Sequence, residues 1–257
     1  MFPLGNDKFL LLPIEKILLF CNFVVVKLTK MKTIAIIVAG GSGTRFGAQM
    51  PKQFLELAGK PILMRTVEAF DTALAGGDHE IVVTLPADQM GLWLELCQQY
   101  AFSVRHRVVA GGETRWHSVK NALDSIGNSA GIDVIAVHDG VRPLASVELI
   151  NRCFDTARRT GSAIPVVPLN DSVRQVEGEE SRALDRSSLR AVQTPQAFEA
   201  QMLLDAYRLP FEQTFTDDAS VVERAGHSVT LVDGDPQNLK ITRPMDLALA
   251  EYLLRNA

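Results

Sequence analysis

The sequence predicts an α/β fold with an open, mostly parallel central sheet and a projecting β-arm. Two observations support this prediction. From Met31 onward, short runs of β-branched residues alternate with longer segments whose apolar residues recur at helical spacing. A strongly polar stretch between Asn170 and Gln193 interrupts this alternation. Strands that are joined through helices lie parallel, so the repeated pattern favours an open sheet with helices packed on it.

Five segments have the length and the β-branched composition of buried strands. They are Thr33–Val38, Glu80–Leu85, Val104–Val109, Asp133–Val137 and Ser162–Val167. The first of them leads directly into the glycine-rich run "AGGSG". A strand that ends in such a loop is typical of the ligand-binding edge of an open α/β sheet.

The segments between these strands predict helices. Pro61 suits the first position of a helix, where its missing N–H is not needed. The apolar residues of that helix are Leu63, Val67, Phe70 and Leu74. A second helix carries Val119, Ala122, Leu123 and Ile126. In a third helix Ser146 is the expected N-cap and Gly161 the end, and its apolar stripe is Ile150, Cys153, Phe154 and Ala157.

The polar stretch predicts a projecting hairpin, a β-arm of about residues 170–192. Short alternating pieces flank the turn-prone letters "EGEES", which is typical of two strands joined by a turn. A disordered surface insertion is the alternative that the composition leaves open. Beyond the arm we expect a helix near Glu199–Arg208, a helix from Asp217, a strand at Ser228–Val232, and a final helix from Pro244 with Thr242 as its cap.

Composition excludes several classes of protein. The 257 residues are 47% hydrophobic and 22% charged, as in globular proteins with a full core, and the formal net charge is −4. No basic stripe offsets that charge, so neither nucleic acid nor an anionic membrane is an expected partner. The three cysteines include no C-x-x-C pair, so they predict neither a disulfide framework nor a zinc site, and a cytoplasmic location is expected.

Residues 1–30 differ from the rest of the chain. Their apolar run is broken by Pro13, Glu15 and Lys16 before it reaches the roughly 18 residues of a membrane span. The run also lacks the layout of a secretory signal peptide. Met31 then opens a segment typical of a protein whose first strand lies at its N-terminus. We therefore expect residues 1–30 to be a non-native or disordered extension, and residues 31–257 to form a single domain.

The loop after the first strand predicts a phosphate-bearing ligand. Glycines in "AGGSG" let main-chain N–H groups approach an anion or a flat base edge closely. The letters exclude a P-loop, a dinucleotide fingerprint and a nucleophile elbow. Arg45 and Lys52 follow, and Pro51 bends the chain so that Lys52 can return to the loop. Two cations beside bare backbone suit a triphosphate, whereas a tight turn without a ligand remains the alternative.

Three other loops add polar side chains to the same predicted edge. In "VHDGVRP", Asp139 ends a strand and could ligate Mg²⁺ or a hydroxyl group, and Arg142 could hold a phosphate. In "AGGETRWHSV", a glycine pair precedes a helix that contains Ser118. Lys240 lies between a late strand and the last helix. We expect these groups to converge because the carboxyl ends of parallel strands meet at one edge.

The residues that are absent constrain the mechanism. The sequence shows no metal-binding histidine spacing, no paired-carboxylate motif and no nucleophile motif. A phosphomonoester acceptor needs no general base, because it is already largely dianionic at neutral pH. Transfer from a nucleoside triphosphate to such an acceptor requires in-line positioning and stabilisation by Mg²⁺, lysine and arginine. The residues present match that reaction.

Several separated motifs, in matching order, resemble the 2-C-methyl-D-erythritol 4-phosphate cytidylyltransferase family. The motifs are "AGGSGTRFGAQMPKQF", "VHDGVRP", "DRSSL", "TPQAF", "TDDAS" and "NLKITRPMDLALAE". The resemblance implies a Rossmann-like nucleotidyltransferase. Such an enzyme joins CTP to 2-C-methyl-D-erythritol 4-phosphate, releases pyrophosphate and serves non-mevalonate isoprenoid synthesis.

The resemblance also implies roles for individual residues. Residues at the cytidine and its phosphates would be Ala39, Gly40, Gly41, Gly43, Gly112, Ser118 and Lys240. Arg45 and Lys52 would stabilise the transition state at the α-phosphorus. Asp139 would lie beside Mg²⁺ and the sugar hydroxyls. The acceptor would be held by Arg142, Ser172, Arg186 and Thr194. The β-arm would exchange with a second subunit of a homodimer, so Ser172 and Arg186 would complete the partner's site.

Two departures from the family pattern keep alternatives open. The letters "HDGVRP" replace the usual "HDAARP", and Ser172 stands where the arm usually has threonine. Related enzymes that transfer cytidylyl to ribitol 5-phosphate also vary before "RP", so ribitol-5-phosphate cytidylyltransferase is one alternative. A non-catalytic nucleotide-binding module is another, although it would not need transition-state cations. A hydrolase is opposed by the failed nucleophile elbow at Thr44.

Overall fold

A computed structural model of the chain describes residues 31–40 and 50–256. The predicted extension at residues 1–30, and the predicted site residues Gly41, Gly43 and Arg45, lie outside the described residues. Among the residues that are described, no helix combines the length and the apolar character that crossing a membrane requires.

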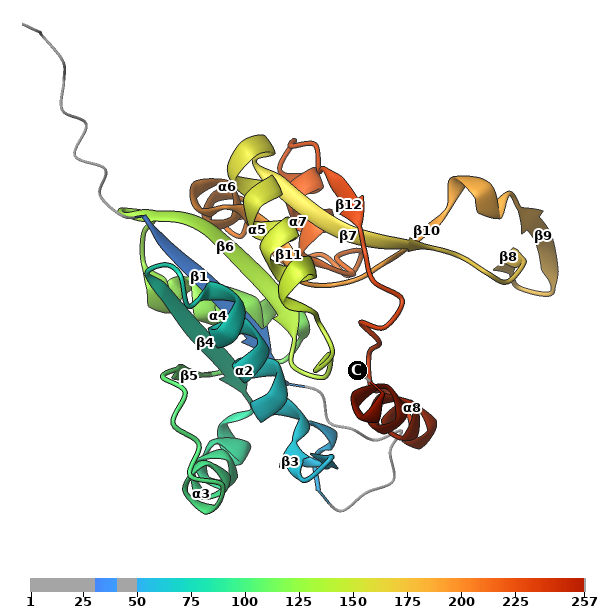
Figure 1. Ribbon diagram of the computed structural model, residues 1–257. Helices are drawn as coiled ribbons and strands as arrows, with labels where there is room; N and C mark the ends of the chain where they lie inside the picture. The colour runs from blue at the N-terminus through green and yellow to red at the C-terminus, as the bar shows by residue number, and fades with distance from the viewer. Residues whose placement is uncertain (1–30, 41–49, 257) are drawn as a thin grey trace, which may run out of the picture.

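The core of the described structure is an eight-stranded sheet (Figure 1). Seven strands follow the order β10-β7-β11-β6-β1-β4-β5, and β12 pairs with β7. Their bounds are β1 (Lys32–Val38), β4 (His79–Leu85), β5 (Arg107–Ala110), β6 (Ile132–Asp139), β7 (Ser162–Pro168), β10 (Arg190–Val192), β11 (Gln196–Glu199) and β12 (Leu231–Asp233). The pairs β6–β1, β1–β4, β4–β5 and β7–β12 are parallel, whereas β11 and β10 pair antiparallel. The predicted mostly parallel sheet is confirmed.

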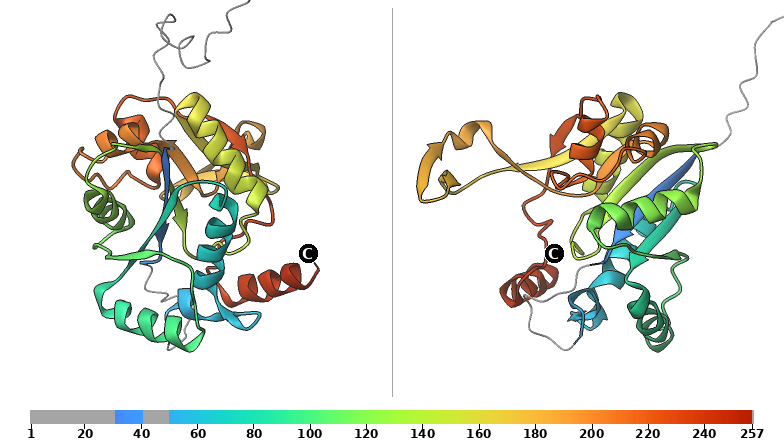
Figure 2. Two further views of the ribbon diagram at one scale, coloured as in Figure 1. Left: turned by 60° about the vertical axis from the view of Figure 1, so that its left-hand side comes forward. Right: turned by 180° about the vertical axis from the view of Figure 1, so that it is seen from behind.

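Helices cover both faces of this sheet (Figures 1 and 2). One apolar cluster joins one face of the sheet to α2 (Ile62–Leu74), α3 (Met90–Gln99) and α5 (Val147–Thr160). The other joins the opposite face to α4 (Arg115–Ile126), α6 (Ala200–Ala206) and α7 (Asp218–Arg224). Adjacent residues of β1 alternate between the clusters, since Ala35 and Ile37 belong to the first and Ile34 and Ile36 to the second. This alternation explains why buried parallel strands read as continuous apolar runs.

Local signals in the sequence account for the ends of α5. The Ser146 hydroxyl accepts a hydrogen bond from the Leu149 N–H at 3.2 Å, which satisfies one unpaired donor of the first turn. Gly161 adopts a left-handed conformation, with φ of 88°, and its N–H bonds to the Ala157 carbonyl. Both predicted boundaries are confirmed.

The polar stretch forms a hairpin, not a disordered insertion. Strands β8 (Val173–Glu177) and β9 (Glu180–Leu184) pair with each other, and the short helix η4 (Arg186–Ser188) follows. The hairpin projects from the body of the molecule (Figure 1). The chain returns through β10, which pairs antiparallel with β7.

Several elements were not expected from the sequence, and the start of two expected strands was misplaced. Neither α3 nor the antiparallel strand β11 was expected. The strand expected at Val104–Val109 begins at Arg107, because pairing with β4 starts there, opposite Val82. The strand expected at Ser228–Val232 begins at Leu231, where pairing with Ile164 of β7 starts.

Two helix starts also differ from the expectation. Pro61 is the N-cap of α2 and not its first residue, because its ψ of 137° is extended and it pairs with Glu56 across β2 (Glu56–Leu57) and β3 (Lys60–Pro61). Arg243, and not Thr242, is the N-cap of α8 (Pro244–Arg255). Asp246 reaches back instead, and its carboxylate accepts hydrogen bonds from the main-chain N–H and the hydroxyl of Thr242.

Candidate active site

Two cavities meet at the carboxyl ends of the central strands. The first has a volume of about 200 Å³ and is lined by five of the predicted residues, Ala39, Gly40, Lys52, Gly112 and Ser118. The second has a volume of about 260 Å³ and is lined by Arg142 and Thr194. Asp139, Lys240 and Arg115 line both cavities. The structure thus brings together nine of the predicted site residues, which come from five separate stretches of the chain.

The loop after β5 is packed tightly against α4. The Gly112 N–H donates to the Ser118 hydroxyl at 3.1 Å, and that hydroxyl donates to the Thr114 carbonyl at 3.0 Å. A Cβ atom at Gly112 would lie 2.4 Å from Cβ of His117, far inside contact distance. A larger side chain at position 112 would therefore clash with His117. Ser118 holds the loop in shape, because its single hydroxyl proton is donated to the Thr114 carbonyl.

Gln53 anchors the start of the glycine-rich loop. Its side chain is 1% exposed, and Nε2 donates to the Ala39 carbonyl at 2.9 Å and to Oε1 of Gln89 at 2.6 Å. Gln53 belongs to the short helix η2 (Lys52–Phe54), which Pro51 precedes with an extended ψ of 135°. This bend directs Lys52 to the cavity as expected. The sequence analysis did not single out Gln53, although Gln53 directly follows Lys52, which was already expected at the site.

Asp139 lies at the centre of the site and contacts three cations. Its Oδ2 atom is 2.9 Å from Nζ of Lys240 and 3.4 Å from Nε of Arg142. Its Oδ1 atom is 3.4 Å from Nε of Arg115. Burial alone would raise the pKa of Asp139, but Arg115, Lys240 and Arg142 outweigh burial and hold that pKa well below its usual range. The carboxylate is therefore charged at neutral pH.

Arg115 is itself held by a buried acid that sequence reasoning did not assign. Nη2 of Arg115 is 2.7 Å from Oδ2 of Asp218, whose side chain is completely buried. The other oxygen of Asp218 accepts a hydrogen bond from the Tyr207 hydroxyl at 2.7 Å. Burial, reinforced by the charge of Asp218, raises the pKa of Tyr207 well above its ordinary value. The letters "TDDAS" had been noted as a motif, and they contain this residue.

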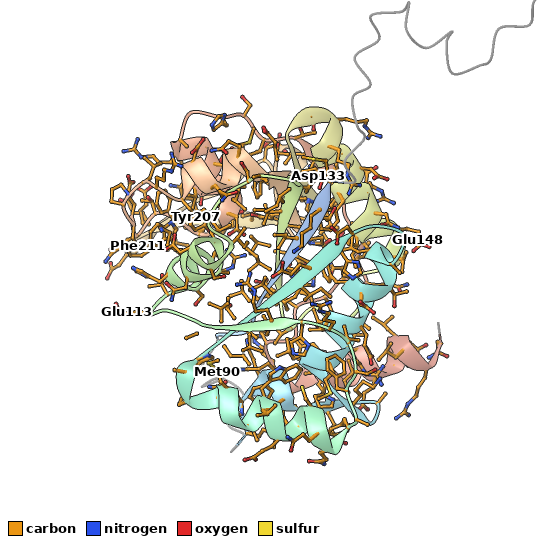
Figure 3. The ribbon with its side chains drawn as sticks, turned by 90° about the vertical axis from the view of Figure 1, so that its left-hand side faces the viewer. Met90, Glu113, Asp133, Glu148, Tyr207 and Phe211 are labelled. Carbon is orange, nitrogen blue, oxygen red and sulfur yellow. The ribbon has the colours of Figure 1, made fainter. Side chains whose placement is uncertain are left out.

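The aromatic residues beside α4 complete the wall behind this network. Trp116 stacks on Tyr207, with ring centroids 5.5 Å apart, and also contacts Phe211 at 5.7 Å. Figure 3 shows Tyr207 and Phe211 next to each other beside α4. These contacts fix the first turn of α4, from which Arg115 reaches both Asp218 and Asp139.

Two predicted residues lie outside both cavities. Ser172 and Arg186 belong to the exposed β-arm, and neither lines a cavity that contains Asp139. Arg186 donates instead to the main-chain carbonyl of Asn170, at the base of the arm. Within one chain these two residues are thus separate from the remainder of the predicted site.

A cavity that is lined by glycines and cations lies at the carboxyl edge of an open, mostly parallel sheet. This combination is typical of one class of protein, and the chain is a Rossmann-like nucleotidyltransferase. A profile of the 2-C-methyl-D-erythritol 4-phosphate cytidylyltransferase family matches residues 33–256. The chain therefore belongs to this family, as the sequence motifs had indicated.

Individual relatives agree with this assignment. Proteins named 2-C-methyl-D-erythritol 4-phosphate cytidylyltransferase are 49% identical in Porphyromonas gingivalis, over 88% of this chain and 99% of the relative, and 37% identical in Geobacillus thermodenitrificans, over 86% and 96%. The solved structure of that enzyme from Thermus thermophilus is 31% identical, with a TM-score of 0.65 over 86% of this chain and 98% of the other. The 4-diphosphocytidyl-2C-methyl-D-erythritol synthase of Anaerococcus prevotii is 26% identical, with a TM-score of 0.72 over 88% and 97%.

Proposed function

We propose that this chain transfers the cytidylyl group of CTP to 2-C-methyl-D-erythritol 4-phosphate in the synthesis of isoprenoid precursors by the non-mevalonate route. An oxygen of the acceptor phosphate attacks the α-phosphorus of CTP, the bond to the β-phosphate oxygen breaks, and pyrophosphate leaves. The observation that carries the proposal is the position of Asp139, Lys240 and Arg115 on the wall shared by the two cavities. Two anionic substrates could meet there, one in each cavity.

The first cavity suits the nucleotide. Its wall contains Ala39, Gly40 and the Gly112 loop, where main-chain groups can approach a base closely. Gly41 and Gly43, which follow Gly40 in the sequence, are proposed to contact the nucleotide as well. Lys52 lines this cavity and, with Arg45, is proposed to stabilise the charge that develops at the α-phosphorus. Because the acceptor phosphate is already largely dianionic at neutral pH, the reaction needs no general base.

Asp139 is the proposed protein ligand of Mg²⁺. Within residues 31–40 and 50–256, no three acidic, histidine or cysteine side chains are grouped as a metal site. One carboxylate nevertheless fits this ion, because Mg²⁺ is commonly bound through one or two carboxylates together with substrate phosphates and water. When bound there, Mg²⁺ would polarise the phosphates of CTP. Lys240 and Arg142 already contact the same carboxylate and would remain close to those phosphates.

A homodimer through the β-arm is part of the proposal. An isolated two-stranded hairpin is marginally stable in water, yet β8 and β9 pair only with each other within the described chain. Val176 on this hairpin is 67% exposed, and Val192 at its base is 45% exposed. A partner subunit that covers the arm would bury these side chains and would receive Ser172 and Arg186 beside its own acceptor cavity.

A cytoplasmic location also belongs to the proposal. CTP and phosphorylated sugar alcohols are intracellular metabolites, and Cys97 and Cys153 of the described chain are free thiols. Burial raises the pKa of both thiols, which keeps them protonated and unreactive at neutral pH.

Pyrophosphate release tests the proposal. The full chain is incubated with CTP and Mg²⁺ and with 2-C-methyl-D-erythritol 4-phosphate, with ribitol 5-phosphate, or with neither. We expect release that depends on the methylerythritol phosphate. Release only with ribitol 5-phosphate would support cytidylyl transfer but identify a different acceptor and a different pathway. Release without an acceptor would indicate a hydrolase, and CTP binding without any release would indicate a binding module.

A further inference from the structure

His138 lies beside the proposed acceptor cavity and has no part in the mechanism above. It belongs to β6, directly before Asp139, and its side chain is completely buried. The imidazole packs on the ring of Phe70, with centroids 4.7 Å apart. The completely buried ring lies against an aromatic face, and its nitrogens face a carbonyl and a hydroxyl group, so this environment favours the uncharged imidazole. A buried polar ring in this position needs a hydrogen-bond partner at each nitrogen.

The partners of the two nitrogens define the tautomer. Nε2 lies 3.1 Å from the main-chain carbonyl of Arg142, which can only accept, so Nε2 carries the proton. In a neutral ring Nδ1 then has a lone pair and must accept. Its neighbour, at 3.0 Å, is the Thr194 hydroxyl, which therefore donates its proton to His138.

This arrangement leaves the Thr194 hydroxyl without a proton for a substrate. The hydroxyl oxygen already accepts a hydrogen bond from the Asp139 N–H at 3.1 Å. One lone pair remains, so Thr194 can accept one more hydrogen bond but can donate none. A phosphate dianion offers only acceptor oxygens. The Thr194 hydroxyl is consequently unable to bind the acceptor's phosphate, but it can accept from a hydroxyl group.

The same residues form a closed ring of hydrogen bonds. Nη1 of Arg142 donates to the Asn238 carbonyl at 2.7 Å, and the Asn238 side-chain amide donates to the Thr194 carbonyl at 2.8 Å. Asn238 is completely buried. His138 closes the ring between Thr194 and Arg142. A shift of its imidazole would therefore displace both of them and the main chain of Asp139.

We propose that His138 is a positioning residue that fixes Thr194 as a hydrogen-bond acceptor, and that Thr194 recognises a hydroxyl group of the sugar-alcohol phosphate. The proposal rests on the cytidylyl transfer proposed above and refines its acceptor specificity. Arg142 can still bind the phosphate, because its Nε and Nη1 atoms contact Asp139 and the Asn238 carbonyl and orient the guanidinium, while the ring of hydrogen bonds does not use its Nη2 atom.

The first test measures the tautomer directly and needs no substrate. Two-dimensional ¹⁵N–¹H spectra of the full chain distinguish a protonated from an unprotonated ring nitrogen, and His138→Gln identifies the signals of His138. We expect Nε2 protonated and Nδ1 unprotonated, with the Nδ1 shift altered in Thr194→Val and retained in Thr194→Ser. A protonated Nδ1 in the wild type would overturn the proposal, whether or not the chain transfers cytidylyl groups.

The second test separates positioning from general damage to the fold. Thr194→Val should raise the KM for the acceptor about tenfold, the effect of one lost hydrogen bond, while the Kd for CTP is unchanged. Thr194→Ser should restore the wild-type KM. His138→Gln should raise the acceptor KM in the same way, and His106→Gln, at a histidine that bonds Trp93 away from both cavities, serves as the matched control.

Acceptor analogues that each lack one hydroxyl identify the contact. With the analogue that lacks the recognised hydroxyl, wild type and Thr194→Val should have equal KM values, whereas they should differ about tenfold with the other analogues. An unchanged difference with every analogue would assign Thr194 to the phosphate or to the fold alone and would refute the proposal. If no acceptor supports turnover, cytidylyl transfer fails while the tautomer measurement still decides the role of His138.

Discussion

Replacement of Asp218 by alanine should destabilise the protein strongly, although Asp218 lies behind the proposed site and does not line either cavity. The carboxylate is completely buried and is bonded at 2.7 Å both to Arg115 and to the Tyr207 hydroxyl. Alanine would leave a partly buried guanidinium with Asp139, at 3.4 Å, and a buried Tyr207 hydroxyl without its acceptor. The perturbation is therefore the loss of one partner from a buried charge network.

The size of the effect follows from these contacts. Loss of one member of a buried ion pair costs about 3–5 kcal/mol. Because Arg115 keeps its contact with Asp139 and is 27% exposed, we expect the lower end, about 3 kcal/mol. For a protein of this size that corresponds to a fall in Tm of about 6–12 °C. Glu212→Ala is the matched control, since its pair with Arg224 is exposed and should cost at most about 1 kcal/mol.

Urea denaturation followed by circular dichroism measures both variants. A double variant, Arg115→Met with Asp218→Leu, should recover much of the lost stability, because apolar residues of similar volume replace buried ion pairs at little cost. The double variant should not recover turnover if Arg115 is needed to hold the Asp139 carboxylate in place. A loss below about 1 kcal/mol in Asp218→Ala, equal to that of the control, would refute the reasoning from burial.

Three further predictions concern the site and the fold. Lys52→Ala should lower kcat far more than it weakens CTP binding, as a comparison of steady-state kinetics with calorimetric CTP titration would show; unchanged turnover would contradict a transition-state role. The lowered pKa of Asp139 means that its stabilising charge is fully present above its ordinary pKa, near 4, and is lost as pH falls toward the lowered value. Denaturation midpoints should thus fall less steeply with acidification in Asp139→Asn than in the wild type, and equal slopes would contradict the assignment. Ser146→Ala should cost about 1 kcal/mol through loss of the α5 cap without changing kcat, measured by denaturation and turnover of the same sample.

The sequence was most informative where one local pattern determined the structure. The apolar run of β1 and the serine and glycine at the ends of α5 are such patterns, and the structure has both elements as expected. The convergence of Asp139, Lys52 and Lys240 was predictable for a related reason. Each follows a predicted strand or its loop, and the carboxyl ends of parallel strands share one edge.

Long-range pairing accounts for what the sequence could not predict. The residues of the Arg115–Asp218 pair are 103 positions apart, and no periodicity relates them. Strand β11 has four residues and lies antiparallel between β6 and β7, a position that depends on sheet order and not on its own letters. The tautomer of His138 depends on the partners of both ring nitrogens, which come from two separate stretches of the chain.

Only the structure distinguishes the three cations around Asp139, which look alike in the sequence. Arg115 is also bonded to buried Asp218, and Arg142 is 11% exposed and also bonded to the Asn238 carbonyl. Lys240 is 42% exposed, and its ion-pair partner within the described chain is Asp139. A flexible, partly exposed lysine exchanges partners more readily than the two arginines, which are fixed by buried bonds. Arg115 and Arg142 therefore form the rigid frame of the site, and Lys240 is the cation of the three that is able to turn from Asp139 toward an incoming phosphate.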